Sequence, residues 1–120
     1  NGLAFSPNEK ILYVADTGEP GNIVAYDVMD GKHLVNPREF AIVRPGKADG
    51  FRCDNDGNIF TSAWDGIQVY SPEAELLGKI LVPEQRTANC CFGGPHGNRL
   101  YIAGDHSFYS IVLNARGVGY

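Results

Sequence analysis

The chain has 120 residues, of which 43% are hydrophobic and 20% are charged, a composition typical of one folded globular domain. Its net charge of −4 is spread without a run of like charges, which argues against nucleic acid or an anionic membrane as a partner. Every apolar run is too short for a transmembrane helix, so we expect a soluble protein. The chain starts at Asn1 rather than at a Met, so we expect a piece of a longer protein or a processed one. The sequence favours neither a cytoplasmic nor a periplasmic or secreted location.

Short segments rich in β-branched and aromatic residues follow one another along the whole chain and predict β-strands. Turn-forming dipeptides such as Asp-Gly and Gly-Asn separate them, and no long stretch has the period of a helix. The polar segment 72–78 resembles a single helical turn, but it is short and ends in Gly, so we predict an all-β chain. In chain order, the predicted strands are residues 11–15, 22–26, 59–63, 66–70, 77–82, 100–103 and 108–113.

A pattern of two strands joined by a turn occurs three times, which is typical of repeat proteins. Each copy begins with a polar residue and an apolar strand, turns through Asn, Asp, Pro or Gly, and continues into a second apolar strand. The copies start at Asn1, Asp49 and Asn89, at intervals of about 40–50 residues. About four strands in such an interval form one blade of a β-propeller. We therefore predict about three propeller blades, with a β-sandwich as the alternative.

Three blades are too few for a closed propeller, because closed rings have roughly four to eight. We therefore expect residues 1–120 to form a partial β-propeller. Its first and last blades would leave a sheet face and strand edges without a neighbour. Further blades of the same protein, or a second copy of the chain, would have to cover them.

Equivalent positions of propeller repeats lie on a ring around the central channel, and here this position holds Asn1, Asp49 and Asn89. All three side chains offer oxygen atoms, which hard divalent cations prefer as ligands. Asn-Gly and Asp-Gly are also frequent in tight turns, so a purely structural role is the alternative. Asp49 lies where a strand begins, whereas Asp56 already belongs to the turn that closes the following hairpin. This difference favours a metal site at Asp49.

Two other motifs fit known sites poorly. The acidic segment 54–58 resembles the start of an EF-hand loop, but the ligand positions would fall on Arg52 and Ala63, so we predict a hairpin turn. Residues 105–107 are Asp, His and Ser, the members of a nucleophilic triad. Neighbours on a strand point to opposite faces, so we expect a loop here instead.

Arg52 follows Asp49 closely and is a candidate for contact with a polar ligand. Trp64 lies at the end of a predicted strand, where we expect it to pack against the core rather than to form the wall of a pocket. An odd number of cysteines, two of them adjacent and none in a C-x-x-C pair, predicts buried free thiols without a disulfide or a structural zinc. These cysteines are Cys53, Cys90 and Cys91.

The sequence resembles the senescence-marker/gluconolactonase (regucalcin-like) family of six-bladed propellers. Matching segments run in order along nearly the whole chain, among them Asn-Gly-Leu at 1–3, Asp-Gly-Phe at 49–51 and Cys-Cys-Phe-Gly-Gly at 90–94. The resemblance implies that the chain is the C-terminal half of such a propeller. It also implies hydrolysis of a sugar lactone such as gluconolactone.

In that family a divalent metal lies at the channel mouth, held by a Glu of the N-terminal part, by the Asn of the Asn-Gly-Leu motif and by an Asp. The last two correspond to Asn1 and Asp49, while the Glu has no counterpart here and Ala48 replaces a usual Pro. The resemblance thus implies Asn1 and Asp49 as metal ligands, with Asp49 also catalytic. We expect calcium, with zinc, magnesium or manganese as alternatives. Asn89 and Arg52 are expected in the substrate pocket.

The predicted function is therefore metal-dependent hydrolysis of a small-molecule lactone. We expect the 120-residue chain by itself to be inactive, because it lacks one ligand and needs the N-terminal half of the propeller to close the ring. One alternative is a non-catalytic propeller module that binds a protein or a sugar. Another is a related metal-dependent ester or phosphoester hydrolase, which would share the ligands and differ in the pocket.

Overall fold

The computed structural model describes all of residues 1–120, and they form β-strands joined by turns, without a helix. Every sheet is antiparallel and is built from strands that follow one another in the sequence. No helix is therefore present that could cross a membrane.

The first sheet consists of β1 (Leu3–Phe5), β2 (Ile11–Ala15), β3 (Asn22–Met29) and β4 (His33–Ile42). The second consists of β5 (Phe51–Cys53), β6 (Ile59–Ser62), β7 (Gly66–Tyr70) and β8 (Leu76–Leu81). The third consists of β9 (Thr87–Gly93), β10 (Arg99–Gly104) and β11 (Phe108–Val112).

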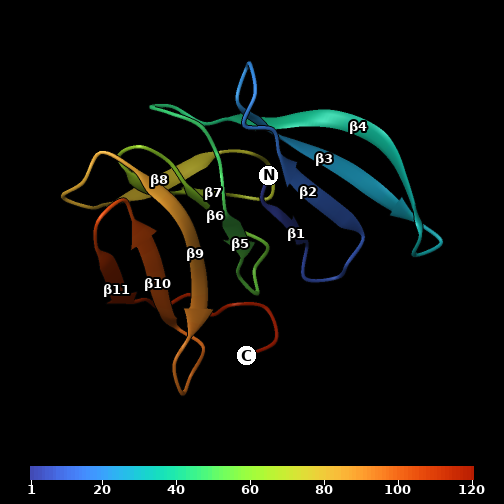
Figure 1. Cartoon of the computed structure of the whole chain (residues 1–120). Helices are drawn as coiled ribbons and strands as arrows, with labels where there is room; N and C mark the ends of the chain where they lie inside the picture. The colour runs from blue at the N-terminus through green and yellow to red at the C-terminus, as the bar shows by residue number, and fades with distance from the viewer.

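The first strands of the three sheets, β1, β5 and β9, lie next to one another, and the remaining strands of each sheet fan outward from them (Figure 1). This is the arrangement of propeller blades around an axis. The prediction of an all-β chain with about three blades is thereby confirmed. The third blade has three strands, whereas the other two have four.

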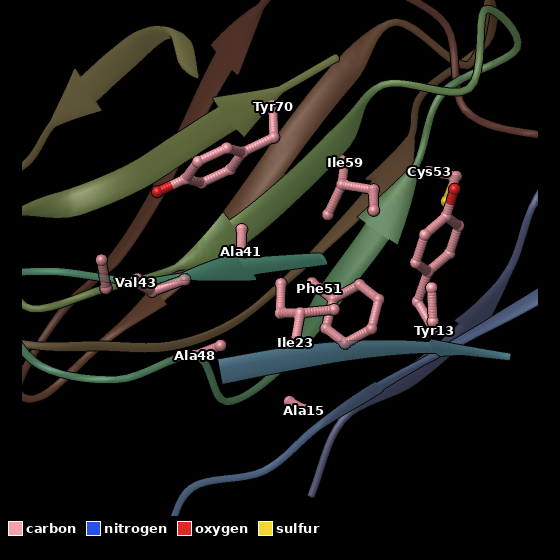
Figure 2. Packing of buried hydrophobic residues seen from close by; sticks show 12 residues of the cluster. Tyr13, Ala15, Ile23, Ala41, Val43, Ala48, Phe51, Cys53, Ile59 and Tyr70 are labelled. Atoms are coloured by element: carbon pink, nitrogen blue, oxygen red, sulfur yellow. The ribbon is translucent and has the colours of Figure 1, made fainter. Parts of the chain in front are cut away.

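Two apolar cores separate the three blades. The larger one lies between the first and second sheets, where Ile23, Phe51 and Ile59 are fully buried against one another (Figure 2). The second lies between the second and third sheets and includes Phe60 and Leu100. Because the middle sheet is covered on both faces, all four side chains of β6 are buried, although neighbours on a strand point in opposite directions.

One strand was not expected from the sequence. Strand β4 was not predicted, because most of its side chains are polar or exposed, as is typical of the outer edge of a sheet. The segment 72–78 forms a turn followed by the start of β8, in agreement with the prediction of an all-β chain without a helical turn. The hydroxyl of Ser71 accepts hydrogen bonds from the backbone N–H groups of Glu73 and Glu75, each at 3.2 Å, and this closes the turn.

The cysteines are free, as predicted, but only two of them are buried. Cys53 and Cys90 face the cores between the blades, whereas Cys91 is exposed. The prediction of three buried thiols was wrong for Cys91. Adjacent residues on β9 face opposite sides of the sheet, and the outer side of the last blade has no neighbour in this chain.

Candidate functional site

Asn1 and Asp49 occupy equivalent positions at the start of the first strands of neighbouring blades. The backbone of Gly2 packs directly against the carbonyl group of Asp49, so the two strand starts are in contact. The terminal amino group of Asn1 donates a hydrogen bond of 2.7 Å to the carbonyl of Ala15, which ties this end of β1 to β2. The two residues predicted as metal ligands therefore lie at the same end of neighbouring inner strands, with Gly2, the neighbour of Asn1, against Asp49.

The backbone of Asp49 is held by Ser62, the last residue of β6. Its N–H donates to the hydroxyl of Ser62 at 3.1 Å, and the Ser62 N–H donates to the carbonyl of Gly50 at 3.0 Å. The side chain of Asp49 is half-buried, and its carboxylate has no hydrogen-bond or ion-pair partner in the chain. The side-chain amide of Asn1 likewise has no partner. The oxygen atoms of both side chains are thus available to a ligand.

Asn89 is placed differently, because it is the third residue of β9 rather than a residue that precedes its strand. Its side chain packs against Gly50, and its Oδ1 accepts a hydrogen bond of 2.9 Å from the N–H of Cys90. Asn89 and Arg52 share a recess of about 210 Å³ that also includes Phe108 on the outer face of the third blade. The two predicted pocket residues therefore lie together, in a recess separate from that of Asp49.

Asp49 lines a recess of about 440 Å³ at the end of the blades where the inner strands begin. Trp64, expected to pack against the core, is 47% exposed and forms part of the recess wall. The guanidinium of Arg86 lies 5.1 Å from the centre of the Trp64 ring, within range of a cation–π interaction. The residues that line the recess are Thr17, Lys47, Asp49, Trp64, Arg86, Thr87, Ala88 and Asp105.

Sequence reasoning missed Arg86, Lys47 and Thr17 as neighbours of Asp49. The repeat nevertheless indicates which segments lie near Asp49. The segment that follows the second strand of each copy returns to the end where the first strand begins, because the two strands are antiparallel. Trp64 follows the second strand of the second copy, and this placement alone would put it at the recess.

A buried amide holds the loop that leads to Asp49. The Nε2 group of Gln68 donates to the backbone carbonyl of Arg44 at 2.7 Å and to the carboxylate of Asp65 at 3.0 Å. Burial acts to raise the pKa of Asp65, but hydrogen bonds from Lys79 and Gln68 outweigh burial and leave the pKa below its usual value. Asp65 therefore stays ionised and keeps Gln68 oriented toward the loop.

Glu84 joins the two loops that carry Arg86 and Asp105. Its carboxylate accepts hydrogen bonds from the backbone N–H of His106 at 3.2 Å and from the hydroxyl of Tyr109 at 2.9 Å. Partial desolvation acts to raise the pKa of Glu84, but these hydrogen bonds hold it below the usual range. The ionised carboxylate thus holds the loop of His106, whose neighbour Asp105 lines the recess.

The donor set of Asn1 and Asp49 suits a hard cation. It offers one carboxylate and one neutral amide oxygen, whereas calcium takes six to eight oxygen ligands, so water, a substrate or other protein groups would supply the rest. No cluster of three or more His, Cys, Asp or Glu side chains occurs in the chain. The two residues therefore fit a share of an oxygen-ligated metal site.

The two motifs judged unsuitable from the sequence have structural roles. Asp54 is buried, and its Oδ1 accepts hydrogen bonds from the N–H groups of Asp56 and Asn58 at 3.0 and 2.8 Å, which closes a hairpin turn. Asp105 and His106 lie on an exposed loop, with 3.9 Å between the Asp105 carboxylate and the His106 Nε2. Both predictions, a turn and a loop, are confirmed.

Comparison with known proteins agrees with this architecture. Residues 1–106 match the family described as SMP-30/Gluconolactonase/LRE-like region. The chain is 37% identical to a gluconolactonase of Zymomonas mobilis, over 92% of this chain and 34% of that protein. It is 32% identical to a 6-deoxy-6-sulfogluconolactonase of Pseudomonas putida, over 85% of this chain and 36% of that protein.

A solved structure of a gluconolactonase from Xanthomonas campestris superimposes with a TM-score of 0.88 and 38% identity, over 94% of this chain and 37% of that one. The chain thus spans about a third of the length of these relatives. Most of the chain, including the segments that carry Asn1 and Asp49, lies within the matched region. The chain therefore belongs to the SMP-30/gluconolactonase/LRE-like family.

Proposed function

We propose that this chain is part of a metal-dependent lactonase that hydrolyses a sugar lactone such as gluconolactone. The observation that carries the proposal is the pairing of Asn1 and Asp49. Their backbones are in contact through Gly2, their side-chain oxygens have no partner in the chain, and Asp49 opens onto a recess. The names of the relatives, two gluconolactonases and a 6-deoxy-6-sulfogluconolactonase, support the choice of reaction.

In this proposal Asn1 and Asp49 hold a divalent cation, with calcium expected because all their donors are oxygens. The bound cation supplies a Lewis acid that polarises a lactone carbonyl. Asn1 contributes a neutral oxygen, so the positive charge of the site is kept. Asp49 takes a proton from the water that attacks the carbonyl carbon, and the ring oxygen leaves as an alcohol when the C–O bond breaks. Asn89 and Arg52 contact the substrate only if it extends beyond the recess of Asp49.

We also propose that further blades complete the ring and cover the two outer faces of this chain. Leu3 is 59% exposed and Phe5 is 45% exposed on the outer face of the first blade. Phe108 is 71% exposed and Val112 is 56% exposed on the outer face of the third. Apolar sheet faces of this kind bind a neighbour in a finished propeller. The test is binding of a hydrophobic dye, which should be strong for the 120-residue chain and weak for the protein that contains all blades (the ring-complete protein).

The activity test compares Asp49→Asn with Asp56→Asn in the ring-complete protein. Both variants remove one carboxylate, but Asp56 is exposed in a hairpin turn at the opposite end of the strands. Hydrolysis of gluconolactone is followed by acid release, after chelation and during titration with calcium. We expect Asp49→Asn to lower turnover about 100-fold or more and to weaken calcium binding, with Asp56→Asn unchanged.

Equal turnover of the Asp49→Asn variant and the parent would overturn the role of Asp49. Turnover that survives complete chelation would overturn the metal dependence. A ring-complete protein that binds sugars without hydrolysing any lactone would favour the non-catalytic binding module. The 120-residue chain alone is expected to show no turnover.

A further inference from the structure

The recess beside Asp49 contains one cation that has no acidic partner. Lys47 pairs with Glu19, with 3.2 Å between its Nζ and a carboxylate oxygen. Arg86, by contrast, has no carboxylate within 4 Å, although Asp105 lines the same recess. The guanidinium of Arg86 is therefore a free donor group at the candidate site.

Trp64 presents this guanidinium to the recess. Gly46 packs so closely on the indole that any side chain at this position would overlap the ring, and the backbone N–H of Trp64 donates to the carbonyl of Pro45 at 3.1 Å. The indole is thus held in place on its own side of the recess. A guanidinium that rests on an aromatic ring keeps its N–H donors free for another group.

The backbone beside Arg86 is also fixed. The hydroxyl of Thr87 lies 2.8 Å from the carbonyl oxygen of Gly66 and 2.9 Å from that of Ala63, and Thr87 is buried. Arg86 immediately precedes Thr87, the first residue of β9, so the hydrogen bonds of Thr87 fix the backbone from which the exposed Arg86 side chain extends. The Cα atom of Arg86 therefore stays close to Trp64. Packing against Gly46 holds Trp64, and the hydrogen bonds of Thr87 hold the backbone next to Arg86. The relative position of the two side chains is therefore set by these contacts.

We propose that Arg86, held on Trp64, binds the anionic oxygens of a sugar acid in this recess and acts as a specificity-determining residue. The choice of ligand rests on the proposed lactonase function. A guanidinium matches a carboxylate or a similar oxyanion through paired hydrogen bonds. Two groups could supply the anion: the carboxylate that lactone hydrolysis creates, or an anionic substituent on the lactone itself. A neutral sugar offers only hydroxyl groups and would bind more weakly.

The first experiment measures binding without activity. Trp64 is the only tryptophan of the 120-residue chain, so its fluorescence reports directly on ligands near Arg86. Sodium gluconate should cause a saturable change in the emission, while glucose at equal concentration should not. Arg86→Met should weaken gluconate binding about tenfold or more, and Arg86→Lys should restore part of it. Arg99→Met is the matched control, because Arg99 lies at the opposite end of the third blade, where its guanidinium donates a hydrogen bond to the hydroxyl of Ser110.

The second experiment uses the ring-complete protein and separates the two sources of the anion. If the product carboxylate is bound, Arg86→Met raises the inhibition constant of gluconate about tenfold. If a substituent is bound, Arg86→Met raises the KM of an acidic lactone, such as a monolactone of glucaric acid, about tenfold more than that of gluconolactone. Arg99→Met should leave both quantities unchanged.

Either result in the second experiment supports the proposal. Gluconate binding to the Arg86→Met chain as tight as to the parent chain would overturn it, as would an equal response to glucose and gluconate. So would a parent chain whose emission does not respond to gluconate at all. Failure of the lactonase function would be visible separately, as an absence of turnover, while the fluorescence titration would still decide whether Arg86 binds sugar acids.

Discussion

The backbone of Gly2 lies so close to the carbonyl of Asp49 that a Cβ atom on Gly2 would overlap that oxygen. This contact joins the first blade to the second at the proposed metal site. A residue with a side chain at this position must push the two strand starts apart. The contact therefore links stability and site geometry at a single position.

We expect Gly2→Ala to lower the free energy of unfolding by about 1–3 kcal/mol, because its methyl group meets backbone rather than a flexible side chain. It should also weaken calcium binding, since Asn1 and Asp49 move apart. Thermal unfolding and calorimetric calcium titration of the ring-complete protein measure the two effects. The control is Gly78→Ala on the exposed strand β8, where a Cβ meets nothing within 4 Å. An unchanged melting temperature for Gly2→Ala would contradict the close contact.

Thr87 connects the third blade to the second through a buried hydroxyl. Its Oγ1 lies 2.8 Å from the carbonyl oxygen of Gly66 and accepts a hydrogen bond from the N–H of Ala63 at 3.2 Å. Thr87→Val keeps the shape but removes these contacts of the hydroxyl, while the Ala63 N–H keeps its hydrogen bond of 2.9 Å to the Gly66 carbonyl, so we expect a loss of about 0.5–1.5 kcal/mol in the free energy of unfolding. Thr87→Ser, which restores the hydroxyl, should recover most of it in urea titrations. Equal stability of the Val and Ser variants would show that the hydroxyl is dispensable.

The buried thiols predict a dependence of stability on alkaline pH. Burial raises the pKa of Cys90 from 9.0 to about 12, and that of Cys53 likewise to about 12. Above pH 9 the unfolded chain releases these protons while the folded chain keeps them, so stability falls as the pH rises from 9 toward 12. Each thiol should contribute a slope of about 1.4 kcal/mol per pH unit in that window.

Urea unfolding at a series of pH values tests this dependence of stability on pH, with variants of the adjacent residues Cys90 and Cys91. Cys90→Ala should remove its share of the alkaline slope, about 1.4 kcal/mol per pH unit, and leave that of Cys53, whereas Cys91→Ala, which changes an exposed thiol, should leave the slope as in the parent chain. If both variants reduce the slope equally, burial does not set the pKa of Cys90.

The C-terminal segment ties the second blade to the third at the end opposite Asp49. The Gly117 N–H donates to the carbonyl of Gly97 at 3.0 Å, Gly117 pairs with Asp54, and the side-chain amide of Asn55 donates to the carbonyl of Tyr120 at 3.0 Å. Deletion of residues 117–120 should therefore cost about 1–3 kcal/mol in the free energy of unfolding.

Differential scanning calorimetry measures the effect of this deletion. Asn114→Ala is a suitable control, because Asn114 is exposed in the same segment. A truncated chain with the melting temperature of the parent would mean that the segment only lies on the surface.

Some strands of this fold can be predicted from the sequence alone, and others cannot. The alternation of apolar residues predicted β2, β6, β7 and β10 within a residue or two, because each has at least one face buried against a neighbouring blade. It did not predict β4, whose side chains are largely exposed and whose pairing with β3 contains irregularities. An outer edge strand is stabilised by backbone pairing with its neighbour, which leaves little trace in the residue pattern.

The sequence by itself determined the repeat, and with it the equivalent positions of Asn1 and Asp49 at the start of two inner strands. This was readable because the blades recur along the chain at a nearly constant interval. Only the tertiary structure decided what surrounds them. Trp64 and Arg86 meet at Asp49 through contact between two blades, whereas Arg52, only three positions from Asp49, faces a different recess. Packing between blades, rather than distance along the chain, decides which side chains share a site, and no local pattern records that packing.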